Sequence, residues 1–84
     1  MVFFAKVFIS PRADVLDPQG DAVEHALHSL GYDEVRGVSL GRYLEVELDA
    51  SDADAATARL SAMCETLLAN TVVEDFRFEL ESRS

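Results

Sequence analysis

The chain of 84 residues has no tryptophan, a single cysteine and only two prolines, and it contains no long apolar run. With Cys64 alone, an internal disulfide is excluded, and a lone cysteine on the apolar face of an expected helix is typical of a small core side chain. No stretch approaches the roughly 20 apolar residues of a membrane span, and the apolar start lacks a signal-peptide ending. We therefore expect a protein of a reducing, cytoplasmic compartment, without a membrane association.

Basic residues are also scarce: seven lysines and arginines stand against sixteen acidic residues, a formal net charge of −9. Such a surface repels phosphate, which excludes a nucleic-acid partner and disfavours a nucleotide site on this chain. The acidity keeps the chain soluble and can help to steer it toward a basic partner surface. The length allows one small domain, expected over residues 1–84.

The apolar pattern predicts six elements. They are a strand at Val2–Ile9, a helix at Pro18–Leu30, strands at Val35–Leu40 and Arg42–Leu48, a second helix ending near Ala69, and a strand at Val72–Leu80. Gly41 is expected at a tight turn and Gly31 in the left-handed position after the first helix. The order βαββαβ predicts an α+β fold: a ferredoxin-like two-layer sandwich with a four-stranded antiparallel sheet and both helices on one face.

The first strand is apolar on both faces. Phe3, Ala5, Val7 and Ile9 point one way, and Val2, Phe4 and Phe8 point the other. Only one face can meet the helices, so the second needs another cover. We predict that the chain associates with itself as a dimer or tetramer, with Phe4 and Phe8 in the interface.

Groups that carry chemistry do not gather into a site in this sequence. His25 and His28 are one helical turn apart, but no third ligand completes a metal site. Glu45 and Glu47 share the outer face of one strand, as expected for a wetted or interfacial surface rather than acid–base catalysis. The glycines lack the spacing of a phosphate-binding loop. We predict no catalytic, cofactor-binding or metal-binding residue on this chain.

The run Val15-Leu16-Asp17-Pro18-Gln19-Gly20 is the most informative stretch. Asp17 is a favoured N-cap, and Pro18 stands where a helix tolerates proline best. Together with Leu30-Gly31-Tyr32, Gly41-Arg42-Tyr43-Leu44-Glu45-Val46 and the late segment from Leu67 to Phe76, this run resembles the small PurS-type subunit of phosphoribosylformylglycinamidine synthase. The resemblance extends from about Val7 to Glu79.

The resemblance implies a non-catalytic subunit that bridges a PurL-type synthetase and a PurQ-type glutaminase in purine biosynthesis. The complex would use ATP and Mg, with no cofactor on this chain. The residues that carry over are Asp17, Pro18, Gln19, Gly20 and Asn70, in structural or interfacial roles. Three departures stand out: a longer loop at residues 10–14, Thr71 where the family has proline, and Arg42 where it has lysine.

Two other classes are weighed against this interpretation. A small ACT-like ligand-sensing domain shares the βαββαβ order, but the loop after the first strand contains no glycine before Gly20. A stand-alone enzyme lacks any catalytic constellation. The assembly subunit is therefore preferred.

Overall fold

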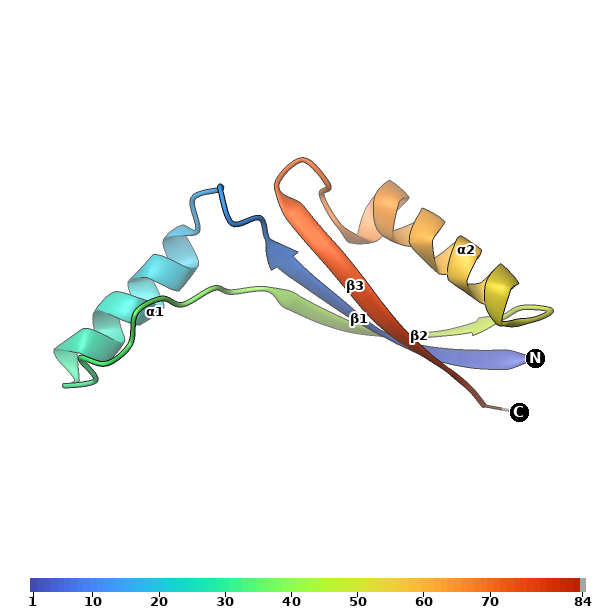
Figure 1. The fold of residues 1–84 in the computed structure, drawn as a ribbon, viewed down its shortest axis with the longest axis horizontal. Helices are drawn as coiled ribbons and strands as arrows, with labels where there is room; N and C mark the ends of the chain where they lie inside the picture. The colour runs from blue at the N-terminus through green and yellow to red at the C-terminus, as the bar shows by residue number, and fades with distance from the viewer. Residues whose placement is uncertain (84) are drawn as a thin grey trace.

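The computed structural model describes residues 1–83. Its elements are β1 (Val2–Pro11), α1 (Pro18–Ser29), β2 (Arg42–Asp49), α2 (Ala53–Met63), a single π-helical turn η1 (Cys64–Leu68) and β3 (Glu74–Ser82). Figure 1 shows the three strands side by side with α2 over them, while α1 stands beyond one end of the sheet. The α+β class, two helices and an antiparallel sheet agree with the sequence prediction.

The sheet has three strands in the order β2-β1-β3, and both pairings are antiparallel. The predicted fourth strand at Val35–Leu40 is wrong, because this described segment forms no ladder. Its backbone groups meet α1 instead: the Val35 carbonyl oxygen lies 2.7 Å from His28 Nε2, and the Leu40 N–H donates to Asp17 Oδ2 at 3.0 Å. The segment therefore runs back along the helix, and the tight hairpin expected at Gly41 is absent.

The core lies between α2 and one face of the sheet. Asp52 starts α2 by accepting a hydrogen bond from the Ala55 N–H at 2.8 Å. The fully buried side chains come from this helix, from η1 and from the alternate positions of β1 that the sequence assigned to the inner face: Phe3, Ala5, Val7, Ile9, Ala56, Leu60 and Cys64. The predicted inner face of the first strand is confirmed.

The prediction that both helices cover one face is wrong, because α1 does not lie on the sheet. Residues 12–41, here called the arm, comprise the loop 12–17, α1 with its C-cap Leu30, and the return segment 31–41 (Figure 1). The stripe expected to be buried is largely open, with Val23 40% and Leu30 74% exposed. The Cα radius of gyration is 16.5 Å, whereas a compact chain of this length has about 12 Å. The chain by itself is elongated.

Candidate functional site

The carboxylate of Asp17 joins the two halves of the arm. Its Oδ1 accepts from the Gly20 N–H at 3.0 Å, which is the predicted N-cap, and its Oδ2 accepts from the Leu40 N–H at 3.0 Å. These two backbone donors, that of Leu40 first, lower the pKa of Asp17 below its usual value near 3.8. Asp17 therefore holds both the start of α1 and the end of the return segment.

Gly20 is buried because the return segment passes directly over it. A Cβ built at this position would lie 2.3 Å from the Val38 carbonyl oxygen, so no side chain fits. The resemblance assigned Gly20 a structural or interfacial role, and the backbone that approaches it belongs to the same chain. Pro18 occupies the first turn as expected, and Gln19 is exposed beside it.

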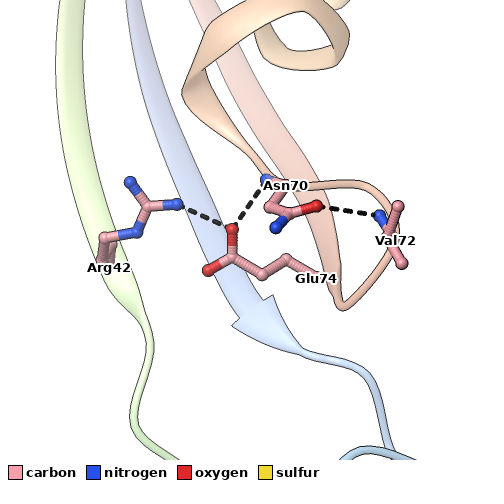
Figure 2. Close-up of polar contacts among 4 residues, drawn as sticks. All are labelled: Arg42, Asn70, Val72 and Glu74. Carbon is pink, nitrogen blue, oxygen red and sulfur yellow. Dashed lines mark hydrogen bonds and ion pairs between the residues drawn. The ribbon is translucent and has the colours of Figure 1, made fainter.

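Asn70 shapes the turn between η1 and β3, as Figure 2 shows. Its side-chain oxygen accepts from the Val72 N–H at 3.2 Å, and its own N–H donates to Glu74 Oε1 at 2.7 Å. Arg42, at the start of β2, donates to the same Glu74 oxygen at 2.7 Å. The Asn70 N–H and the Arg42 guanidinium lower the pKa of Glu74. The turn is thus tied across β1 to the far strand of the sheet.

The loop after β1, which leads into α1, contacts the turn between η1 and β3 at one end of the sheet. Arg12, in the longer loop after β1, donates from Nη1 to the Thr71 carbonyl oxygen at 3.2 Å, and its N–H donates to the Val73 carbonyl oxygen at 2.9 Å. An open cleft of about 580 Å³ lies there, and Asp17 and Asp75 both line it. We call the surface formed by Asp17–Gly20, the loop 10–14 and the turn 70–74 the signature end.

The sheet face opposite α2 carries Phe4 and Phe8, as predicted. Both rings are half-buried within the single chain, because the Arg83 guanidinium lies 4.2 Å from the Phe4 centroid and the Arg77 guanidinium lies 4.0 Å from that of Phe8. Tyr43 packs against Phe8 with 5.2 Å between ring centroids. Burial, and then the nearby Glu45, raise the pKa of Tyr43. The patch is therefore aromatic with a charged border, rather than bare.

His28 and Cys64 both have structural roles: His28 is hydrogen-bonded to the return segment, and Cys64 is buried in the core. Because a carbonyl oxygen only accepts, the Nε2–H of His28 donates a hydrogen bond to the Val35 carbonyl oxygen. Cys64 is fully buried, and burial followed by the charge of Glu65 raises the pKa of its thiol. Within residues 1–83, no three histidine, cysteine or acidic side chains gather where they would hold a metal. No helix in that range is long and apolar enough to cross a membrane.

The sequence of this chain matches a known protein family over nearly its whole length. Residues 4–82 match the family model described as PurS, phosphoribosylformylglycinamidine (FGAM) synthase. The chain belongs to the PurS family. The PurS subunit of FGAM synthase from Bacillus subtilis is 50% identical over 80 residues, covering 95% of this chain and 94% of that protein. The Synechocystis subunit is 44% identical, covering 93% of this chain and 78% of its own length. This chain is accordingly a PurS subunit of the FGAM synthase complex of purine biosynthesis.

Solved structures share the same shape. The Bacillus subtilis PurS structure superimposes with a TM-score of 0.85 at 50% identity, covering 95% of this chain and 99% of that chain. Methanocaldococcus jannaschii PurS, described as one of the subunits of formylglycinamide ribonucleotide amidotransferase in the purine biosynthetic pathway, gives 0.84 at 27% identity, with coverages of 98% and 99%. A chain of the Thermotoga maritima PurLQS structure gives 0.87 at 27%, with coverages of 96% and 99%. The matches favour the assembly subunit over the ACT-like alternative.

The sequence pointed to Asp17–Gly20 and Asn70 but not to their connections. It missed Arg12 and the Arg42–Glu74 pair, which tie the loop and the turn to the sheet. The available signal was the basic residue in a loop otherwise rich in small and acidic residues, and an arginine at the start of a strand. Neither signal predicts which residue the arginine contacts, because in both pairs the two residues are more than thirty positions apart in the sequence.

Proposed function

We propose that this chain is the non-catalytic bridge between a PurL-type synthetase subunit and a PurQ-type glutaminase subunit. The observation that supports this proposal most is the signature end. There the loop 10–14 is hydrogen-bonded to the turn 70–74, and Gln19 is exposed at the start of α1. ATP and Mg then act on the larger subunits, and this chain holds no cofactor. The complex is cytoplasmic, and this chain contributes its single domain, residues 1–84.

Two observations support this role. Two carboxylates of the signature end are engaged in structural hydrogen bonds, Asp17 with backbone donors and Glu74 with Arg42. Carboxylates held in this way suit recognition rather than chemistry. The Thermotoga maritima PurLQS structure contains a chain of this fold within a complex whose name joins the three subunits.

Reconstitution tests the bridge. The purified chain alone should show no ATPase, glutaminase or ligase activity. Added to the two larger subunits, it should restore glutamine-dependent formation of formylglycinamidine ribonucleotide. Ammonia supplied directly serves as the control, since it bypasses the glutaminase and should make the product less dependent on this chain. Equal glutamine-dependent rates with and without the chain would contradict the proposal.

The role of Gln19 is tested against that of Asp17. Gln19→Ala removes an exposed amide and should leave the melting temperature unchanged while weakening assembly of the three-subunit complex. Asp17→Ala should lower the melting temperature through the lost cap. A larger loss of stability in Gln19→Ala than in Asp17→Ala would reverse the two roles.

We also propose that the chain associates with itself through the face that carries Phe4 and Phe8. A second copy would bury more of these rings, at about 25 cal/mol per Å² of apolar surface before the costs of association. Phe4→Asp should weaken the oligomer, because a carboxylate loses its hydration there. Light scattering across a dilution series measures the mass. A value of 9.2 kDa for the unmutated chain at micromolar concentration would refute self-association.

A further inference from the structure

The turn 70–74 is exposed and yet firmly held. Asn70, Thr71 and Val72 are all exposed, so burial does not fix their positions. Hydrogen bonds do: the Asn70 carbonyl oxygen accepts from the Val73 N–H at 3.0 Å and from the Glu74 N–H at 2.7 Å. The Asn70 side chain and the Glu74 carboxylate add the bonds drawn in Figure 2. The conformation of this turn is therefore set by hydrogen bonds rather than by packing.

The backbone of the turn is of type I. Residues 70–73 are closed by the bond from the Val73 N–H to the Asn70 carbonyl oxygen. Within residues 1–83, only a glycine has a positive φ and no peptide bond is cis, which excludes types II, I′, II′ and VI. Proline is favoured at the second position of a type I turn, where Thr71 stands, and the Thr71 N–H makes none of the backbone hydrogen bonds of the turn. Thr71→Pro should therefore keep this turn and stiffen it.

Arg12 holds the turn from the loop after β1. Its N–H donates to the Val73 carbonyl oxygen at 2.9 Å, and its Nη1 donates to the Thr71 carbonyl oxygen at 3.2 Å. These two carbonyl groups flank Val72 in the chain. Arg12 is itself exposed, so it adds nothing to the core. Its bonds fix the backbone on both sides of Val72.

Val72 is the side chain that the turn presents. It is 78% exposed, and Figure 2 shows it on the side of the turn away from β1 and β2. Valine has a stiff χ1 angle, and the backbone around it is already fixed. An apolar side chain held in this way loses little conformational entropy when another protein covers it, so more of the burial energy goes into binding.

We propose that the turn 70–74 is a docking turn for a larger subunit of the FGAM synthase complex. Val72 enters an apolar pocket of that subunit, and Arg12 is the positioning residue that holds the turn in its binding conformation. This inference rests on the bridging role proposed above.

A second copy of this chain fits the docking turn less well than a different protein does. The face proposed for self-association, with Phe4 and Phe8, is a side of the sheet, whereas the turn lies beyond the end at which β3 begins. The net charge of −9 also repels a like-charged copy at so small a contact. The same charge favours a partner whose apolar pocket has basic residues at its rim.

Titration of the full chain into a fixed mixture of the synthetase and glutaminase subunits tests the docking turn. Val72→Asp should raise the concentration that gives half the maximal glutamine-dependent rate by about tenfold or more, as for an anchor residue. Ser51→Asp is the matched control and should leave this concentration unchanged. It adds the same charge at an exposed position, but at the other end of the sheet, where β2 ends opposite Val2.

The titration separates this inference from the bridging role. If the parent chain stimulates the reaction and Val72→Asp acts within twofold of the same concentration, the docking turn is refuted and the bridge stands. Absence of stimulation by the parent would refute the bridge, and the docking turn with it. Where the aspartate variant does not fold, Val72→Ser removes the apolar contact without a charge and is judged by the same twofold limit. Light scattering should give each variant the mass of the parent, and a lower mass would place the turn between copies and overturn the proposal.

The positioning role of Arg12 is tested by rescue. Arg12→Ala should raise the half-maximal concentration about fivefold, because a loosened turn must be ordered on binding. Thr71→Pro, which fixes the same backbone in another way, should restore it to within twofold of the parent when added to Arg12→Ala. A proline cannot replace a direct contact between Arg12 and the partner. A loss in Arg12→Ala that Thr71→Pro does not reduce would therefore overturn the positioning role.

Discussion

The sheet with α2 and the arm are folded by different means. In the first region, burial dominates: Ala5, Val7 and Leu60 have no exposed surface, and β1 is paired on both edges. In the arm, the only buried residue is Gly20. Two hydrogen bonds hold α1 to the return segment: Asp17 accepts one from the Leu40 N–H, and His28 donates one to the Val35 carbonyl oxygen. One region carries its own core, whereas the other is a short helix fixed at a few points and dependent on what covers it.

The largest difference between the two regions is expected when a core side chain is removed. Leu60→Ala removes a fully buried side chain and should reduce the free energy of unfolding by about 2–5 kcal/mol. Leu16→Ala, at a position 83% exposed in the arm, should change it by less than about 0.5 kcal/mol. Urea denaturation followed by circular dichroism measures both. Equal losses would show that the core is not confined to the sheet and α2.

The next effect concerns the closest contact in the arm. Gly20→Ala drives a methyl group against the Val38 carbonyl oxygen and should destabilise the arm by about 1–3 kcal/mol, despite the better helix propensity of alanine. Gly37→Ala is the control, because its Cβ would meet only Glu24 Oε1 at 3.9 Å. The hydrogen-exchange rates of the α1 amides measure the stability of the arm separately from that of the sheet. Unchanged exchange in Gly20→Ala would mean that the return segment is free to move.

A smaller loss is expected from Asp17→Ala, about 0.5–2 kcal/mol, because the variant removes the cap of α1. It also leaves the Leu40 N–H without its acceptor. Asp52→Ala is the matched variant in the other region, since Asp52 caps α2 but reaches no second segment. We expect Asp17→Ala to speed hydrogen exchange throughout the arm, and Asp52→Ala to act only near the start of α2. The same local pattern in both variants would show that the Asp17–Leu40 bond contributes nothing.

The smallest effect depends on pH. The pKa of Asp17 is lowered in the folded chain, so its ionised form contributes stability above the unfolded value near 3.8, and this contribution is lost as the pH falls through the lower folded value. Asp17→Asn lacks this titration. The difference in stability between parent and variant should therefore be constant at neutral pH and shrink below about pH 4. A difference independent of pH down to 2 would show that the carboxylate charge plays no part.

Local signals were sufficient where the contacts are local. The Asp17 cap, Pro18 in the first turn and the left-handed Gly31 with φ of 98° all involve residues within a few positions of each other, and all three are observed. The inner face of β1 was also predictable, since side chains alternate along a strand. The segment Val35–Leu40 was not, because its apolar residues Val35, Val38 and Leu40 suit a strand and an extended segment lying along a helix equally well.

The sequence by itself determined the family, the two helices, the three observed strands and the Asp17 cap. Each follows from short-range patterns of burial, capping and turn chemistry, or from motifs shared with relatives. Only the tertiary structure decided that α1 leaves the sheet and that Gly20 faces Val38 of its own chain. It also decided that Arg12 ties the loop after β1 to the turn 70–74 and that Glu74 ties this turn to Arg42 of β2. Those contacts join residues 18 to 59 positions apart, and a pattern of local preferences carries no information about which distant backbone will supply the partner.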